Sequence, residues 1–415
     1  MNDRPVKLIV SDDLERSQVT VFFRLILAIP HLIWLAVWGI GAFIVAIVNW
    51  FATLIGGQSP DGLHDFLAGY VRYAIHVYAY LSLAAEPFPD FLGKPGYPID
   101  VQIAPPAPQN RWKVFFRIVL AIPALLIAGA LTSGRVSGTG ANYGLGLAGV
   151  AALLGWFVGV AQARMPRGLR DAIAYALSYA AQVDAYLFLL TDRYPDSDPQ
   201  SAFADLPTRS DPLELEVGGA LERNRLTVFF RLILAIPHLI WLTLWAIAAF
   251  IAAIANWFLT LAGGISPDSL HNFLAAYVRY QQHVYAYLFL IADPFPGFTG
   301  KVGSYPIEPT IAPPATQNRW TVGFRIVLAI PAVLVNSAYS GLLFAVAFLG
   351  WFASLATGRM PLGMRNAGAL ALRYATQANG YYLLLTDAYP YSGPTTLGAP
   401  PLPDTIAASP PEPAF

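Results

Sequence analysis

Hydrophobic positions are gathered into long stretches such as Leu25–Ile55, which contains no Asp, Glu, Lys or Arg. A continuous helix over this stretch is about 46 Å long, whereas the hydrocarbon core of a bilayer is about 30 Å thick. We therefore expect the helix to tilt, kink or break. Gly39–Gly41 lies in the middle of the stretch, and polar residues lie at matching places in Thr132–Tyr143 and Asn336–Gly341. These positions predict where the break occurs.

The stretch Thr132–Tyr143 also contains Arg135. A polar loop cannot lie in lipid with its backbone groups unpaired. We expect this loop at a membrane surface or in a water-filled cavity.

Internal repeats organise the chain. Val21–Leu35 has the same sequence as Val228–Leu242, and this correspondence continues beyond both segments, which indicates a tandem duplication. Each half contains a second, weaker copy with the same order of features: an arginine, a proline, a Trp-Phe pair, another proline and two tyrosines. The resulting four units are residues 16–90, 111–195, 223–297 and 319–390.

The units predict a division of the chain into two membrane halves. Residues 1–195 form the first half, residues 196–222 an acidic linker with a short strand, and residues 223–390 the second half. Residues 391–415 are rich in proline, which cannot continue a helix. We expect this tail to be disordered.

Composition places these repeats in a membrane. Hydrophobic residues make up 56% of the chain and charged residues 12%, and the mean hydropathy is +0.51. Soluble domains carry about a quarter charged residues. The prediction is therefore an all-α integral membrane protein, a tandem-repeat helical bundle with about eight spanning helices and additional interfacial helices. Its expected partners are membrane lipid and other membrane-protein subunits.

Charge and cysteine content exclude several kinds of function. The formal net charge is +0, whereas binding nucleic acid requires a basic excess. The chain contains no cysteine, which excludes disulfides, thiolate nucleophiles and cysteine-bound metals. Because the sequence also lacks recognisable catalytic motifs, we expect a protein that is not an enzyme and binds no cofactor.

Two topologies fit the repeats. With two crossings per unit the chain crosses eight times and all units share one orientation; with three it crosses twelve times and neighbouring units are inverted. The eight-crossing interpretation gathers the basic residues between the units on one side, which is then cytoplasmic. Arg164, Arg167, Arg170, Arg359 and Arg365 fall on the opposite side, against this rule. The chain start shows no cleavable signal peptide, so the prediction is a multi-pass protein of the inner (plasma) membrane with a cytoplasmic N-terminus.

A short extended segment precedes each unit. Val6–Val10, Ile99–Ile103 and Leu213–Val217 alternate between two faces, as strands with one buried face do. Ile307–Ile311 contains Pro309, which is confined to an edge or a bulge of a sheet. We expect these segments to pair into one small sheet at the membrane surface.

The repeated motifs resemble a bacterial membrane-protein family, domain of unknown function 4389. The opening R-x-x-V-F-F-R-x-x-L-A-I-P-H is complete in 225–238, and the close R-Y…Y-x-x-L-x-D-x-x-P is complete in 373–390. The resemblance covers most of the chain, twice over. It implies a membrane location and tandem helical units, without an activity or a catalytic residue. The second and fourth units depart from the pattern at Ala124 and Ala332, where the others have histidine, and at Gly323.

Ionisable residues within the second helix of each unit are the main candidate site. Arg72 falls near the middle of that helix, where an unpaired charge costs about 3 kcal/mol. The predicted intramembrane polar cluster comprises Arg72, His76, Tyr80, Asp184, Arg279, His283, Tyr287 and Arg373. Asp184 is expected to neutralise one of the arginines. The alternative interpretation, which we favour, is a network that only fixes the packing of helices.

A second group of residues marks the opening of each unit. Arg24, Ala28 and His31 share one helical face, which suits an interfacial helix. The predicted interfacial motif comprises Arg24, His31, Arg117, Arg231, His238 and Arg325. The histidines do not converge locally, so no haem or metal site is expected.

Three functions remain open. We rank first a non-enzymatic scaffold or accessory component of a membrane complex, because the repeats carry no catalytic motif. A transporter or channel for a small solute or lipid headgroup is second, with a polar path between the two halves. A haem or quinone redox subunit is third.

Overall fold

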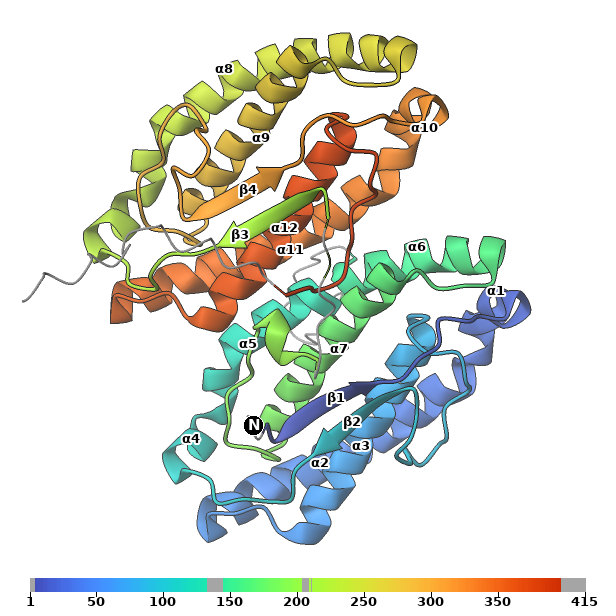
Figure 1. Cartoon of the computed structure of the whole chain (residues 1–415). Helices are drawn as coiled ribbons and strands as arrows, with labels where there is room; N and C mark the ends of the chain where they lie inside the picture. Colours follow the sequence, from blue (N-terminus) through green and yellow to red (C-terminus); the bar gives the residue numbers. More distant parts are fainter. Residues whose placement is uncertain (1–3, 133–144, 204–208, 210, 397–415) are drawn as a thin grey trace, which may run out of the picture.

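The computed structural model describes residues 4–132, 145–203, 209 and 211–396. Each unit consists of an outer helix, in one to three pieces, followed by a shorter inner helix that runs back along it (Figure 1). The outer helices are α1 (Gln18–Leu27) with α2 (Ile29–Gly56), α4 (Arg111–Phe115) with α5 (Arg117–Thr132) and α6 (Leu147–Gln162), α8 (Arg225–Gly263), and α10 (Arg319–Gly323) with α11 (Arg325–Thr357). The inner helices are α3 (Asp61–Leu81), α7 (Arg167–Leu187), α9 (Asp268–Leu288) and α12 (Leu362–Tyr382).

In the first and fourth units, the outer helices do not break where the glycine and polar residues predicted. In the first unit the interruption is at Ala28, directly before Ile29 and Pro30, and α2 continues through Gly39–Gly41. In the fourth unit α11 continues through Asn336–Gly341. The excess length is accommodated by bending, most visibly in α8, which curves over α9 (Figure 1). The predicted break in the second unit falls mainly on residues outside the described part of the chain.

Proline and left-handed residues delimit the inner helices. Each inner helix begins directly after a proline, whose fixed φ suits this position. Each is followed by a leucine with positive φ, between 62° and 66°, namely Leu83, Leu189, Leu290 and Leu384. A left-handed conformation costs a leucine about 1–2 kcal/mol, and burial of the same side chains, each 2% exposed, offsets this cost.

The strands form at the predicted residues but pair differently. β1 (Val6–Val10) pairs antiparallel with β2 (Ile99–Ile103), and β3 (Leu213–Val217) with β4 (Ile307–Ile311). In the described residues the strands thus make two separate two-stranded antiparallel sheets instead of one sheet. A whole unit, and not a tight turn, joins the two strands of each sheet; we call each such pair a hairpin. Leu8 faces Val101 and Leu215 faces Pro309, so both hairpins have the same register.

The two units of each half are inverted relative to each other. The Gln109 amide that precedes α4 donates to the carbonyl of Gly57 at the end of α2, 2.8 Å away. Reciprocally, the Arg16 amide that precedes α1 donates to Ala163 at the end of α6, 2.9 Å away. Gln317 with Gly264 repeats the first contact in the second half. The common orientation that the eight-crossing interpretation requires is therefore wrong.

Inversion also removes the charge argument for orientation. Basic residues at the starts of the units lie at both ends of each half instead of on one side. The inference of a cytoplasmic N-terminus from these residues no longer applies.

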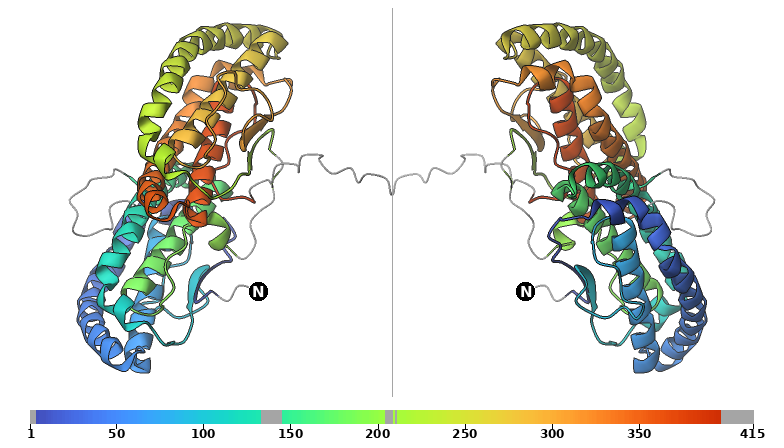
Figure 2. Two further views of the ribbon diagram at one scale, coloured as in Figure 1. Left: turned by 90° about the vertical axis from the view of Figure 1, so that its left-hand side faces the viewer. Right: turned by 90° about the vertical axis from the view of Figure 1, so that its right-hand side faces the viewer.

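The outer helices and the hairpins lie on opposite sides of the molecule. The strands pack on the inner helices, β2 on α3 and β1 on α7. Figure 2 shows α2 and α8 toward one side and the hairpins toward the other. Among the α-helices, the inner helices between these layers have the highest proportion of buried residues. Among the described residues, three helical segments are long and apolar enough to cross a membrane: 18–56, 225–263 and 325–357.

The halves meet where α5 and α6 pack against α11. The start of the proline-rich tail belongs to this contact, because the Tyr391 hydroxyl donates to the carboxylate of Asp171, 2.5 Å away. Tyr339 donates its hydroxyl proton to the Ser392 carbonyl. Residues 391–396 are therefore ordered, contrary to the prediction, because buried polar partners hold them. The rest of the tail lies outside the described residues.

Candidate functional site

The arginine at the opening of each unit binds the end of the inner helix. Arg24 is 2% exposed, and its Nη1 donates to the carbonyls of Tyr80 and Ala85, each 2.8 Å away. Its Nη2 pairs with Glu86, and the guanidinium lies 4.3 Å from the centre of the Tyr80 ring. A cation at this position stabilises the partial negative charge of a helix C-terminus.

The same contact recurs in the other units. The repeated groups are an arginine, the ring of a tyrosine and an aspartate: Arg117 with Tyr186 and Asp192, Arg231 with Tyr287 and Asp293, and Arg325 with Tyr381 and Asp387. We call each such group an arginine clamp. Four copies of one contact, one per unit, indicate a structural role in holding outer to inner helix.

The interfacial motif therefore faces the protein and not the membrane surface. His31 is fully buried, and its Nδ1 lies 2.7 Å from the Tyr73 hydroxyl. His238 and Tyr280 repeat this pair at 2.8 Å. Arg24, Ala28 and His31 share one helical face, as predicted, but this face is buried and the apolar residues around it are the exposed ones.

The central part of the predicted polar cluster is paired with a strand. His76 Nε2 lies 2.9 Å from Asp100 Oδ1 in β2, and Arg72 Nε lies 3.6 Å from the same oxygen. The Tyr97 ring stacks on His76, with centroids 4.7 Å apart. Burial by itself raises the pKa of Asp100, but hydrogen bonds from His76, Gly96 and the Val101 amide hold this pKa below its usual value.

The second half repeats this arrangement with a longer acid. Arg279 Nε lies 2.8 Å from Glu308 Oε1, and His283 Nε2 lies 3.2 Å from Glu308 Oε2. Tyr305 stands where the first half has Tyr97. Arginine and histidine of an inner helix thus share one strand carboxylate in each half.

The remaining members of the cluster lie elsewhere. Arg373 is buried in α12 and donates through Nη2 to the carbonyls of Tyr391 and Gly393, 3.1 and 2.6 Å away. Asp184 is half-buried in α7, and its counterpart Asn379 donates to the side chain of Gln281. The structure joins Arg72 to His76 and Arg279 to His283, but it does not gather the eight predicted residues into one site.

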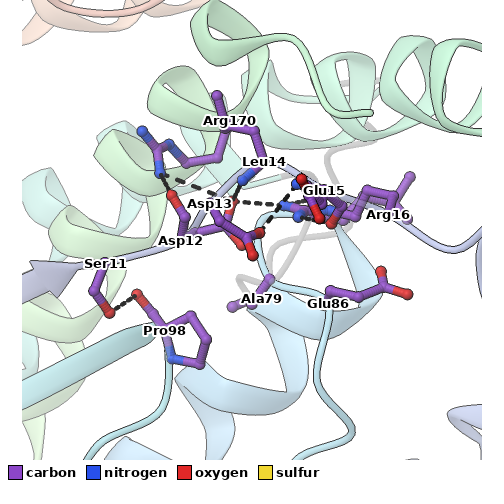
Figure 3. A network of polar contacts seen from close by, with 12 residues as sticks. Ser11, Asp12, Asp13, Leu14, Glu15, Arg16, Ala79, Glu86, Pro98 and Arg170 are labelled. Atoms are coloured by element: carbon purple, nitrogen blue, oxygen red, sulfur yellow. Dashed lines mark hydrogen bonds and ion pairs between the residues drawn. The ribbon is translucent and has the colours of Figure 1, made fainter. Parts of the chain in front are cut away.

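A polar recess lies at the junction of the first two units. Its volume is about 820 Å³, and its lining includes Asp12, Arg16 and Glu86. Figure 3 shows Arg16 and Arg170 turned toward Asp12, with Arg16 Nη2 2.8 Å and Arg170 Nη1 3.8 Å from its carboxylate. Arg16 also donates twice to the Leu83 carbonyl. These contacts hold the junction of the two units together.

Sequence reasoning missed the acidic partners of both kinds of site. Asp100 and Glu308 lie in the strands, and nothing local indicates that a strand packs against the middle of the inner helix. The clamp acids have a sequence signal. Each lies three positions after a leucine in every unit, as in Leu83 with Glu86 and Leu290 with Asp293.

The chemistry of these sites is that of charge neutralisation. The carboxylates of Asp12, Asp100, Glu308 and the arginine clamps already accept from an arginine, a histidine or a backbone amide. Within the described residues no group of three or more His, Cys, Asp or Glu side chains is arranged to hold a metal ion.

Comparison with known families agrees with the four units. The family described as "Domain of unknown function (DUF4389)" matches residues 18–93, 142–197, 225–299 and 319–392, once per unit instead of once per half. No curated protein and no solved structure matches the chain. Since the matches cover more than half of the sequence, the chain belongs to the DUF4389 family and carries repeated copies of its domain.

Proposed function

We propose that this protein is a non-enzymatic component of a membrane, acting as a scaffold or accessory subunit. One observation carries this proposal: the charged residues that a transport path or catalytic site would use are matched by partners within the chain. Arg72 and Arg279 each pair with a strand carboxylate, and Arg373 with backbone carbonyls. Groups neutralised in this way fix the packing of helices.

A transporter, the second candidate, has less support. Its path was expected between the halves, lined by Arg72, Arg279, Arg373, Asp184 and the tyrosines of the units. Two cavities at this seam, about 590 and 460 Å³, are lined mainly by apolar residues such as Leu126, Phe344 and Leu154. None of the four charged residues lines either cavity, although Tyr374 lines the smaller one. An apolar seam favours a structural contact over a route for polar solutes.

The test begins with the location of the full chain. After expression in bacteria, we expect the protein to stay in the membrane pellet through an alkaline carbonate wash and to enter solution only with detergent. Recovery in the supernatant without detergent would contradict a membrane role.

The second part distinguishes scaffold from transporter. Cross-linking in the intact membrane, followed by isolation in mild detergent, should yield a partner subunit in fixed stoichiometry. Proteoliposomes containing the purified chain should release a trapped dye or ions no faster than protein-free vesicles. A flux that depends on the protein would overturn the scaffold proposal and favour the transporter.

A further inference from the structure

The outer helices α1–α2 and α8 expose most of their circumference. In α8 the buried residues form a single stripe with spacings of three, four or seven: Val228, Arg231, Ala235, His238, Leu242, Ala249, Asn256 and Thr260. Only 17% of the most apolar stretch is buried, in α8 and in α1–α2 alike. Such a stripe is one narrow seam against the inner helix. The rest of the surface of α1–α2 and α8 is exposed.

The exposed surface of the outer helices is apolar. Exposed residues of the outer helices include Phe43, Phe250 and Phe344, which are 67%, 62% and 64% exposed. Exposed hydroxyl groups on these helices find partners within the helix: Thr243, Ser340 and Thr357 each donate to the carbonyl four residues earlier. Hydroxyl groups on helices that face lipid are satisfied in the same way.

The indole groups follow the same rule. Five tryptophans of the outer helices donate their N–H to backbone carbonyls of the protein, whereas the buried indole N–H of Trp245 has no partner in the described residues: Trp34, Trp50, Trp241, Trp257 and Trp351 are the five. The outward side of these rings is therefore apolar. Trp112 and Trp320 are 75% and 77% exposed and stand at helix starts beside Arg111 and Arg319. Tryptophan and arginine together are typical of a membrane–water boundary.

The opposite side of the molecule does not tolerate lipid. Each hairpin has two strands within the described residues, so neither of its edges pairs with a further strand. At the β2 edge, polar side chains take the place of a strand: Asp100 accepts from the Val101 amide and Arg72 donates to the Val101 carbonyl. β1 also exposes Lys7. Open strand edges do not occur in the hydrocarbon region, because their N–H and C=O groups find no partners there. Since the hairpins run alongside the inner helices (Figure 1), a bilayer surrounding those helices would also surround the hairpins.

The length of the outer helices also favours a position along the membrane over a crossing. Segments 18–56 and 225–263 each have 39 residues, which corresponds to about 58 Å of helix, nearly twice the hydrocarbon thickness of about 30 Å. Lying flat, a helix is about 10 Å across, which fits within one leaflet of about 15 Å. Interfacial helices embed their apolar side to a comparable depth.

We propose that the outer helices form one continuous surface embedded in the acyl chains of a single leaflet, with the inner helices and hairpins on the water side. This inference rests on the proposed membrane role and replaces multiple crossings with insertion from one side. The occupant of the apolar surface is lipid. In this geometry both ends of every outer helix lie on the same side of the bilayer, so neighbouring units that run in opposite directions require no crossing.

Single cysteines test the proposal, since the natural chain has none. Ser17→Cys and Gln58→Cys mark the two ends of α1–α2, Phe43→Cys marks its exposed middle, and Gln102→Cys marks the hairpin. Each full-length variant is treated with a membrane-impermeant maleimide in sealed right-side-out and inverted vesicles. We expect positions 17, 58 and 102 to react from the same side. Position 43 should react only after detergent is added.

Each other outcome is decisive. If positions 17 and 58 react from opposite sides, the helix crosses the bilayer and the inference fails while the membrane role stands. If position 43 reacts in intact vesicles, the surface is exposed to water and not covered by lipid, and the inference fails. Loss of the chain from the membrane pellet would contradict the proposed function itself. Thermal unfolding of each variant in detergent, compared with the natural chain, serves as the folding control.

Discussion

At the scale of single residues, the duplication allows each residue of one half to be compared with the matching residue of the other half. Gln282 in α9 has no exposed surface, and neither atom of its side-chain amide has a hydrogen-bond partner in the described part of the chain. The matching residue in α3 is Ile75, which is equally buried. One half thus buries an apolar group where the other buries an unsatisfied amide.

We predict that Gln282→Ile stabilises the protein. A buried polar group without a partner costs about 1–3 kcal/mol, and the isoleucine is already accommodated at this place in the first half. The free energy of unfolding in detergent should rise by an amount in this range. The reciprocal change Ile75→Gln serves as the control and should lower it; an unchanged value for both variants would contradict the assignment.

Asp100 gives a prediction that depends on pH. Its pKa is held below the usual value in the folded protein, so its carboxylate stabilises the fold above the unfolded pKa of about 3.9 and loses this effect as the pH falls through the folded pKa. We expect Asp100→Asn to lower the midpoint of thermal unfolding at pH 7. The difference from the natural chain should shrink toward pH 3.

The matched control is Asp65→Asn, because the Asp65 side chain is 82% exposed. Surface substitutions of this kind change stability by about 0.5 kcal/mol or less. A difference between the Asp100→Asn variant and the natural chain that does not vary with pH would show that packing, and not the charge of Asp100, is responsible.

At the scale of the element, the outer helix is held to the inner helix by its seam and its clamp. The clamp arginine Arg231 donates to the carbonyls of Tyr287 and Ala292 and pairs with Asp293. Its removal leaves carbonyls at a buried helix end without partners. The clamp therefore determines where the inner helix ends and how it meets the outer helix.

We predict that Arg231→Met destabilises the protein by about 3 kcal/mol, since breaking a buried ion pair on one side costs about 3–5 kcal/mol and Asp293 retains some access to solvent. Hydrogen exchange should increase most at the C-terminal turn of α9. Arg111→Met, at an exposed position, should leave both measurements nearly unchanged. Equal losses in the two variants would argue against the clamp.

Sequence patterns predicted the elements but not the direction in which their polar faces point. Repeats, helices and strand positions follow from periodicity and proline placement, which are local. The direction of the Arg24–His31 face could not be predicted, because a polar stripe on an apolar helix suits either a membrane surface or a buried seam. Only the position of α3 decides between them, and Tyr73 and Tyr80 supply the partners.

At the scale of the whole molecule, the two halves are joined partly by the beginning of the tail. Tyr391 reaches Asp171 of the first half, and Ser392 accepts from Tyr339. The carbonyls of Tyr391 and Gly393 also satisfy buried Arg373. A short segment thus supplies hydrogen-bond acceptors for one buried guanidinium and links the two halves.

We predict that a chain ending after Pro390 is less stable than one ending after Thr396. The shorter chain leaves Arg373 without these carbonyls, and a buried polar group without a partner costs about 1–3 kcal/mol or more for a charge. Thermal unfolding in detergent should show a lower midpoint for the shorter chain alone. Equal midpoints for both chains would contradict a structural role of residues 391–396.

The sequence by itself determined that the chain contains repeated apolar units, because repetition and hydropathy are properties of the order of residues. It also located the strands, since alternation is local. Only the tertiary structure decided that neighbouring units are inverted and that Asp100 meets His76. It also placed the outer helices and the hairpins on opposite sides. Those features depend on contacts between residues far apart in the chain, which a local pattern does not contain.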